Sequence, residues 1–586
     1  MHKLARLDQK YVWHPFTQMR DWARHEPIVL ARGKGAVLED VRGKKFLDAN
    51  ASIWTNLHGH NHPKLNAALR RQLKKVAHTS ALGFANEPAA LLAERLVKSA
   101  KSSLKKGFFS DDGSTALEVA LKMSYEFTRR MGRARAPKFL SLAGAYHGDT
   151  VGAVSAGHID LFHKAYSGML FKTDKVMSPY CYRCPFNKAK PERGDARDTR
   201  KCNFECVDKV EQRFATRKKR GSNYAALLVE PGMQGPAGMI AQPKGWLGRV
   251  AQIAQGHGTQ LIADEVMTGL GRAACRHFAS HDEGVQPDFL CLAKGLTGGY
   301  LPMAATLTTQ EVFDAFLGDY SELKTFFHGH SYTGNQLGSA ASLASIGLLK
   351  TAASRRKKLA ANLHTEAKRL WSLSQVGDIR QAGCVLAVEL VRDWRTREPF
   401  KLAEQAGIRV CDGLAKRGVD AKFIATGQTG MLVEGDGCPV DAVVTDFISG
   451  AVEKQILAHQ HHEVLVIEGQ GSITHPCYSA VTLGLLHGCL PHGLIYCYEM
   501  GRKMAKGAAH VELPSMESQR DLYLAMANAA YPCRFIGVAI NSRTAEEPAY
   551  RAERDRIESE WNLPACDVFR KNAEPLVETV LEMLKD

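Results

Sequence analysis

Two apolar runs that each end in a polar residue constrain the fold of this chain most. The first, GTQLIADEV, covers residues 258–266, and the second, DFLCLAKGLTGG, covers residues 288–299. A continuous apolar run bounded by turn residues is typical of a strand buried on both faces of a parallel sheet. Asp264 and Lys294 then stand at the carboxyl ends of two strands, where open α/β sheets bind their ligands.

A lysine and an aspartate at one sheet edge suit pyridoxal phosphate chemistry. The amine of Lys294 can form a Schiff base with the cofactor, and the carboxylate of Asp264 can keep the pyridine nitrogen protonated, so that the ring acts as an electron sink. For these two residues alone, a pair of polar strand caps is the better interpretation. Other stretches of the chain decide between the two.

One such stretch has the pattern of a phosphate site. FFSDDGSTALEVALKM, residues 108–123, predicts a strand, a turn and a helix. The first N–H groups of that helix and its dipole could hold an anion at Gly113, Ser114 and Thr115. A plain helix cap explains the same letters equally well.

Two loops offer further contacts to a planar, phosphorylated cofactor. KFLSLAGAYHGDTVGAVSAG predicts a strand followed by a loop with Tyr146 and His147. An aromatic ring at a strand end could stack on a cofactor ring, or it could belong to the core. Ser331 lies at a polar turn before a small-residue helix, where its hydroxyl could reach a phosphate.

Composition indicates an ordinary globular protein. With 586 residues the chain should hold at least two domains. It has no apolar run long enough to span a membrane and no recognisable signal peptide, so we expect a cytoplasmic protein with reduced thiols. The net charge of +16 is spread over separate basic runs without interleaved aromatics, which favours solvated helix faces and neither nucleic-acid nor membrane binding.

A polar insertion carries four cysteines in a spacing close to that of a zinc ribbon. They form CxxC, a gap, and then CxxxC. Because the second pair has three intervening residues and no turn glycine, we predict no metal, with a structural zinc ion as the weaker alternative. The four residues are Cys181, Cys184, Cys202 and Cys206.

Several segments agree in order and spacing with one family. They are WHPFTQM, WTNLHGHNHPKLN, SDDGSTALEVALKM, AYHGDTVGAVSAG, LIADEVMTGLGR, LAKGLTGGYLPMA and FFHGHSYTGNQLG. On these segments, residues from about 11 to 419 resemble the class III (fold-type I) pyridoxal-phosphate aminotransferases. The resemblance implies an α/β fold with a mixed, mostly parallel seven-stranded sheet between helices, and a homodimer with a shared active site.

The resemblance also implies roles for individual residues. Lys294 would be the catalytic Schiff-base lysine and proton shuttle, Asp264 would pair with the pyridine nitrogen, and Tyr146 would cover the ring. Gly113 and Ser114 would bind the phosphate, completed by His330 and Ser331 of the partner subunit. The implied cofactor set is Gly113, Ser114, Tyr146, His147, Asp264, Lys294, His330 and Ser331, and the implied substrate set is Phe16, Ile53, Trp54, Tyr146 and Gly329.

Within the family the segments are most like the branch that acts in biotin biosynthesis, converting 8-amino-7-oxononanoate to 7,8-diaminononanoate. Phe16 stands where some members have a tyrosine that contacts S-adenosylmethionine, and Ile53 replaces a tryptophan of those members. The segments HPFTQM and FFHGHSYTGNQLG look more like the branch that uses lysine, so the amino donor stays open. Another class III aminotransferase, acting on an ω-amino acid or diamine, is an alternative.

The resemblance breaks at Val419. The family continues into a segment with an arginine that holds the substrate carboxylate, and this chain lacks that segment. A pseudoenzyme that binds pyridoxal phosphate without turnover is therefore a further alternative. We divide the chain into residues 1–419, the aminotransferase part, and residues 420–586, a separate truncated α/β unit.

The words ATGQTG, VIEGQGSITHP and VTLGLLHG of the second part resemble a P-loop family that includes D-glutamate N-acetyltransferases. No GxxxxGK[ST] occurs in the chain, so we expect nucleotide binding to be weak or absent. Glu468 is either the vestige of a Mg²⁺ site or an ordinary polar residue at a strand end. Both families carry a word like LAKRGV, which suggests a fusion or an in-frame deletion at that point, and an adapted fusion is the rival interpretation.

Overall fold

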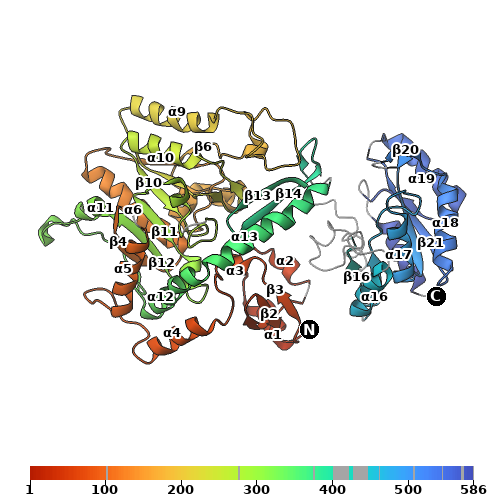
Figure 1. The fold of residues 1–586 in the computed structure, drawn as a ribbon, viewed down its shortest axis with the longest axis horizontal. Helices are drawn as coiled ribbons and strands as arrows, with labels where there is room; N and C mark the ends of the chain where they lie inside the picture. Colours follow the sequence, from red (N-terminus) through yellow and green to blue (C-terminus); the bar gives the residue numbers. More distant parts are fainter. Residues whose placement is uncertain are drawn as a thin grey trace. The chain divides into compact units, whose positions relative to one another are not determined.

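The computed structural model forms two compact units, Met1–Pro399 and Phe400–Asp586. The residues that it describes are 1–24, 26–100, 103–274, 277–373, 376–399, 421–426, 447–460, 462–505, 508–543, 545–568 and 573–584. The domain boundary predicted at residue 419 lies outside them, so it stays a prediction. We describe each unit by itself (Figure 1).

A seven-stranded sheet forms the centre of the first unit. Its order is β4 (Leu104–Ser110), β12 (Ala304–Thr309), β11 (Phe289–Leu292), β10 (Gln260–Asp264), β7 (Tyr224–Val229), β5 (Lys138–Leu142) and β6 (Asp174–Val176). Within this sheet, β12 runs antiparallel to both of its neighbours, and the pairs from β11 to β6 are parallel. The predicted mixed, mostly parallel sheet is confirmed.

Helices cover both faces of this sheet, which explains why its central strands are apolar throughout. Helix α6 (Gly113–Arg130) packs on one face, over β7, β11 and β12. The other face is covered by α5 (Glu87–Ala100), α9 (Glu205–Lys219), α10 (Trp246–Gly256) and α12 (Gln336–Thr351). Every residue of β7, β10 and β11 is buried.

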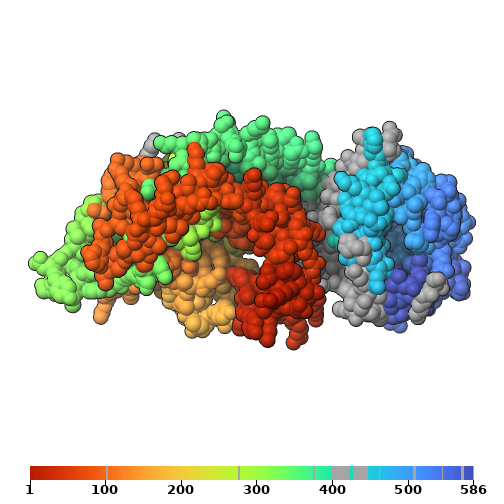
Figure 2. Space-filling model, turned by 90° about the horizontal axis from the view of Figure 1, so that it is seen from below, coloured from red at the N-terminus to blue at the C-terminus, as the bar shows by residue number. Residues whose placement is uncertain are grey.

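The remaining elements of the first unit surround this centre. Its N-terminal part, red to orange in Figure 2, lies over one side of the unit. The helices are α1 (Lys3–Tyr11), α2 (Met19–Trp22), α3 (Ala51–Trp54), α4 (Pro63–Leu73), α7 (Val151–Ala156), α8 (Asp160–His163), α11 (Gln310–Asp314) and α13 (Ala353–Ala367). The strands are β1 (Leu30–Lys34), β2 (Val37–Asp40), β3 (Lys45–Leu47), β8 (Met233–Gln234), β9 (Ile240–Ala241), β13 (Val376–Ala382), β14 (Val385–Asp393) and β15 (Glu398–Pro399).

The run DIRQAGCVLAVELV reads as a single strand in the sequence, and the structure corrects that interpretation. It forms the antiparallel hairpin β13–β14, with a turn at Gly383, whose φ is 56°. A Cβ on Gly383 would lie 2.7 Å from the carbonyl oxygen of Arg272, so the turn also needs glycine for close packing. The apolar residues on both sides of this turn concealed it.

The second unit contains two parallel sheets. One pairs β16 (Ala421–Ile424) with β17 (Val464–Ile467), and the other joins β18 (Gly493–Glu499), β21 (Arg534–Asn541) and β22 (Ala565–Cys566). The other elements are β19 (Met504–Ala505), β20 (Ala508–Glu512), α16 (Ile448–His459), α17 (Ser479–Cys489), α18 (Met516–Asn528), α19 (Glu547–Trp561) and α20 (Glu574–Met583).

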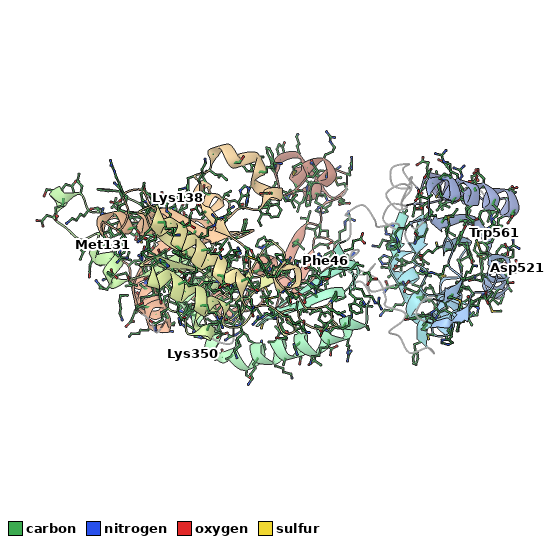
Figure 3. The ribbon with its side chains drawn as sticks, turned by 90° about the horizontal axis from the view of Figure 1, so that it is seen from above. Phe46, Met131, Lys138, Lys350, Asp521 and Trp561 are labelled. Carbon is green, nitrogen blue, oxygen red and sulfur yellow. The ribbon has the colours of Figure 1, made fainter. Side chains whose placement is uncertain are left out.

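Two of the apolar clusters in the second unit pack its helices onto its strands. Trp561, labelled in Figure 3, ends α19 and packs its ring on Tyr496 and Phe535. Leu576 and Val577 of α20 pack against residues of both parallel sheets. Within the described ranges of the whole chain, no helix is long and apolar enough to cross a membrane.

Candidate active site

A buried ion pair stands at the carboxyl end of β10. Asp264 is the last residue of that strand, and its Oδ2 lies 2.7 Å from Nδ1 of His147. Both side chains are buried. Burial acts to lower the pKa of His147, but the hydrogen bond and the charge of Asp264 outweigh it, so the pKa lies above its ordinary value. The pair thus places an acidic side chain and its imidazole partner at this edge of the sheet.

Lys294 lies at the same sheet edge. Strands β10 and β11 are parallel neighbours, with Asp264 opposite Cys291, and Lys294 follows two residues after β11 ends. Burial lowers the pKa of Lys294, and the nearby charges of Asp264 and Glu230 oppose that effect. Among the described residues it has no ion-pair partner, and its Nζ lies 4.8 Å from the ring centroid of Trp54. A lysine in this state is a ready nucleophile.

The start of α6 forms an anion cradle beside this pair. Asp112 caps the helix, and its side chain and carbonyl accept the N–H groups of Thr115 and Ala116. The N–H groups of Gly113 and Ser114 have no acceptor within the described part of the chain. Thr115 therefore belongs to the helix cap, and Gly113 and Ser114 are the residues that could hold a phosphate.

Two glycines let the three loops of the site approach one another closely. A Cβ on Gly113 would lie 2.6 Å from Cγ1 of Val266, on the loop after Asp264. A Cβ on Gly148, whose φ is 120°, would lie 2.3 Å from Oγ of Ser114. The start of α6, the loop after Asp264 and the Tyr146–His147 loop therefore contact one another so closely that a side chain at either glycine would clash.

Tyr146 belongs to the same site. Its hydroxyl donates to Asp149 at 2.6 Å, and its ring stacks on His163. Its backbone N–H donates to Glu230 at 3.1 Å. The carboxyl of Glu230 also accepts the N–H of Gly235, and burial raises its pKa to about 7. Glu230 was not predicted from the sequence. It directly follows the apolar run of β7, and Asp264 was predicted because it ends an apolar run in the same way.

Arg272 is a second functional candidate that the sequence analysis missed. Burial lowers its pKa to about 10, and no carboxylate pairs with it among the described residues. The structure gives its guanidinium one hydrogen bond, a long one of 3.5 Å to the carbonyl of Asn56. Its charge acts on Lys294, so it lies close enough to the site to attract an anion there.

The residues expected to line the substrate channel differ in placement. Trp54 faces Lys294 and packs against the Met233–Met267 cluster, together with Ala382 and Val385 of the β13–β14 hairpin. Ile53 and Phe16 are 61% and 69% exposed, and Phe16 packs edge-on against Phe162. Gly329 is also exposed.

His330 and Ser331 lie on an exposed segment. Nδ1 of His330 is 3.0 Å from Oδ2 of Asp111, next to the cradle of its own chain, and Ser331 is exposed. Several large apolar side chains of the same segment are exposed as well, namely Tyr320, Leu323, Phe327 and Tyr332.

The four cysteines of the insertion are free thiols, with Cys181 and Cys206 buried. Burial raises the pKa of Cys181 to about 12, and the neighbouring cysteines add to that shift. In the described ranges, no three His, Cys, Asp or Glu side chains are placed to hold a metal ion.

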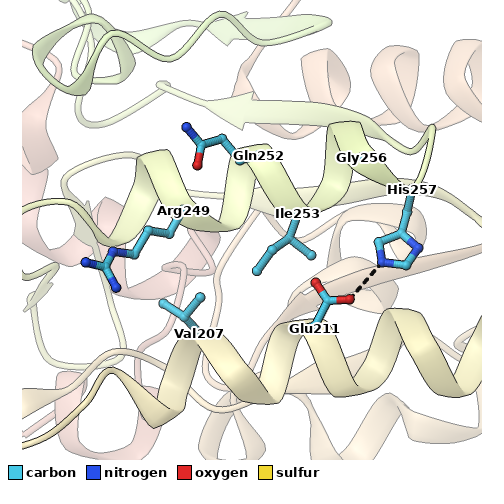
Figure 4. A pocket seen from close by; sticks show the side chains of 7 residues that line it. All are labelled: Val207, Glu211, Arg249, Gln252, Ile253, Gly256 and His257. Atoms are coloured by element: carbon cyan, nitrogen blue, oxygen red, sulfur yellow. Dashed lines mark hydrogen bonds and ion pairs between the residues drawn. The ribbon is translucent and has the colours of Figure 1, made fainter.

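Two hollows lie away from these residues. One of about 650 Å³ runs between α9 and α10, where His257 contacts Glu211 (Figure 4). The other, of about 620 Å³, lies between α6, Phe171 and the segment around Phe326. None of the predicted site residues lines either one.

Two family profiles match the chain. "Aminotransferase class-III" matches residues 19–418, and "Domain of unknown function (DUF1611_C) P-loop domain" matches residues 405–577. The two matches overlap over residues 405–418, which include most of the LAKRGV word.

Curated relatives and solved structures agree with the first profile. An adenosylmethionine-8-amino-7-oxononanoate aminotransferase of Geobacter sulfurreducens is 43% identical, over 77% of this chain and 96% of its own. One of Aquifex aeolicus is 44% identical, over 71% and 89%. The crystal structure of the Methanocaldococcus jannaschii protein of that name matches with a TM-score of 0.63 at 37% identity, over 71% and 90%. An omega transaminase from Pseudomonas jessenii matches with a TM-score of 0.64 at 25% identity, over 71% and 90%.

Proposed function

Because this chain belongs to the class III aminotransferase family and is a pyridoxal-phosphate-dependent aminotransferase, we propose that it aminates 8-amino-7-oxononanoate to 7,8-diaminononanoate in biotin biosynthesis. The observation that carries the proposal is the convergence of Lys294, the Asp264–His147 pair and the α6 cradle at one sheet edge. The names of the curated relatives support the substrate.

The residues present fit pyridoxal phosphate. The N–H groups of Gly113 and Ser114, which have no acceptor among the described residues, suit its phosphate, and the Asp264 side chain, held 2.7 Å from His147, suits its ring nitrogen. Tyr146 would lie over the ring, and Lys294 would bond the cofactor covalently. When bound, the cofactor withdraws electrons from the substrate carbon that carries the amino group.

The chain's own residues would supply the proton transfer. Nζ of Lys294, whose pKa burial lowers, would take a proton from the substrate carbon and return it to the cofactor side. The indole of Trp54 lies over that nitrogen and would keep water away from it. Lys294, which would transfer the proton, and Trp54, which would shield it, therefore come from two separate segments of the chain.

Carboxylate recognition needs another cation in this chain, because the usual arginine segment after Val419 is absent. Arg272 is a half-buried cation without a carboxylate partner among the described residues, so it would serve that role. If no cation takes the carboxylate, the chain would bind its cofactor without turnover.

The amino donor is S-adenosylmethionine or lysine. The names of the relatives favour the first. Phe16 and Ile53 depart from members that use S-adenosylmethionine, and the segments HPFTQM and FFHGHSYTGNQLG look more like members that use lysine. Both side chains are more than half exposed and free to meet a donor.

A homodimer would complete the site. Ser331 and the apolar side chains around it are exposed in the single chain, as residues that enter a partner's site would be. His330 and Ser331 of the partner subunit would then close the phosphate cradle.

We read the second unit as the remainder of a P-loop domain joined at the LAKRGV word. The overlap of the two family matches at residues 405–418 supports a junction there. Glu468 accepts the N–H of Thr426 through Oε2, so it links the ends of β16 and β17, as an ordinary polar residue would. Full activity with normal substrate affinity in the whole chain would contradict a damaging fusion.

The deciding experiment follows the visible absorbance of the purified holoenzyme. We expect it to change with one donor, S-adenosylmethionine or lysine, and to return when 8-amino-7-oxononanoate is added, with 7,8-diaminononanoate as the product. Conversion of simple ω-amines but not of 8-amino-7-oxononanoate would favour the activity that the omega transaminase likeness suggests. A cofactor spectrum that no donor changes would indicate a pseudoenzyme.

A further inference from the structure

The turn that carries Trp54 has an unusual backbone. Ala51, Ser52, Ile53 and Trp54 all have left-handed φ values, of 52°, 49°, 55° and 64°, and none is a glycine. Each L-residue in that region costs roughly 1–2 kcal/mol, so four in succession persist only where surrounding contacts hold them. Hydrogen bonds from Ser52 to Asp48 are among these contacts.

The carboxylate of Asp48 is at the centre of these contacts. Its Oδ1 accepts the backbone N–H of Ser52 and its Oδ2 accepts the Ser52 hydroxyl, both at 2.8 Å. Oδ2 also lies 2.7 Å from Nε2 of His60, and the Asp48 side chain is only 6% exposed. Burial acts to raise the pKa of Asp48, but the hydrogen bonds from Ser52 and His60 outweigh it, so the pKa lies below its ordinary value.

His60 anchors this arrangement to the N-terminal sheet. Its backbone exchanges two hydrogen bonds with Gly35, of 2.7 and 3.0 Å, at the turn between β1 and β2. A Cβ on Gly59 would lie 2.9 Å from Cα of Gly35, so the two segments are in close backbone contact. The strained turn is thus tied through the Asp48 carboxylate and His60 to the β1–β2 hairpin.

From this geometry we infer that Asp48 is a positioning residue, which holds residues 51–54 in the left-handed turn and so keeps the indole of Trp54 over the amine of Lys294. The inference rests on the aminotransferase site proposed above. Asp48 acts through Trp54, whose ring centroid lies 4.8 Å from Nζ. Without the carboxylate, the turn relaxes toward right-handed backbone and the indole leaves the amine open to water.

The first test needs no substrate, so it is independent of which acceptor the enzyme uses. Hydroxylamine removes lysine-bound pyridoxal phosphate, and its rate reports how exposed that nitrogen is. We expect Asp48→Ala to raise this rate about fivefold or more, equivalent to about 1 kcal/mol. The matched control is Asp40→Ala, which removes a carboxylate that accepts the backbone N–H groups of Arg42 and Lys44 at the turn between β2 and β3. Its rate should stay within about twofold of the parent.

Two further variants separate positioning from general destabilisation. In a Trp54→Ala background, Asp48→Ala should add nothing, because the side chain through which it acts is gone. Ala51→Gly should restore the Asp48→Ala protein to within about twofold, since glycine adopts the left-handed backbone without a clamp. If Asp48→Ala does not bind cofactor, Ser52→Ala removes one of the three contacts and should raise the rate about twofold.

Turnover gives a second readout. With the acceptor substrate, Asp48→Ala should raise KM more than it lowers kcat, since the channel wall is displaced and the lysine is intact. Equal hydroxylamine rates for the Asp48→Ala and Asp40→Ala proteins would overturn the inference. So would a full Asp48→Ala effect in the Trp54→Ala background. A parent enzyme that never converts 8-amino-7-oxononanoate would refute the proposed substrate and leave the hydroxylamine result standing.

Discussion

At the scale of single residues, the position of a polar residue at the end of a predicted strand was the most useful signal for the candidate site. Asp264 and Lys294 follow from the rule that polar residues at the carboxyl ends of parallel strands face a ligand, and the structure places both at one edge. Glu230 stands at an equivalent strand end and was still missed. Arg272 could not be found this way, because its lowered pKa and the lack of a carboxylate partner among the described residues are evident only in the folded chain.

The Asp264–His147 pair makes stability depend on pH. The folded pKa of His147 is raised, so the pair's contribution is fully present below the ordinary histidine pKa of 6.5 and is lost as pH rises through the folded value. Asp264→Asn should therefore destabilise the first unit by about 3 kcal/mol at pH 5.5, and by progressively less toward pH 9. Urea unfolding of the cofactor-free protein across that range measures it. A pH-independent difference would contradict the charged pair.

The cradle should be sensitive to one added methyl group. Gly113→Ala forces a Cβ to within 2.6 Å of Val266, and overpacking of that kind costs about 1–3 kcal/mol. We expect pyridoxal phosphate affinity to fall about tenfold, as measured by equilibrium titration of absorbance. Gly347→Ala is the control, because that helical glycine has open space where the Cβ would be.

At the scale of elements, the sequence predicted strands better than their connections. The apolar run over residues 378–391 reads as one strand because the turn at Gly383 has apolar residues on both sides. Polar contacts between residues far apart in the sequence hold the resulting hairpin in place. Arg380 is 3% exposed, pairs with Asp378 and Glu389, and donates to the carbonyls of Gly238 and Met239.

Removing this arginine should loosen the whole hairpin. Arg380→Met takes the cation from the buried carboxylate of Asp378 and leaves Glu389 with Arg183 alone, which costs about 3–5 kcal/mol. We expect that loss in urea unfolding and faster proteolysis within β13–β14. Arg369→Met, which breaks an exposed pair with Glu366, should change stability by less than about 1 kcal/mol. Equal effects of the two variants would show that the network does not fix the hairpin.

At the scale of the whole molecule, the two units should unfold separately. Every residue assigned to the cofactor lies within Met1–Pro399. Pyridoxal phosphate at a thousand times its Kd should therefore stabilise only the first unit, by about 4 kcal/mol. Calorimetry with and without cofactor tests this, and Mg²⁺-ATP should move neither transition, because the chain lacks the phosphate-binding P-loop. A single transition that shifts as a whole would mean that the units are coupled.

The guanidinium of Arg272 has a practical consequence. A cation with no carboxylate partner among the described residues, in surroundings that lower its pKa, attracts whatever small anion the solvent supplies. Sulfate, phosphate or chloride in an assay buffer would then compete with the acid group of the substrate. Apparent Michaelis constants for this enzyme would rise with the concentration and the kind of anion present, and constants from different buffers would not be comparable.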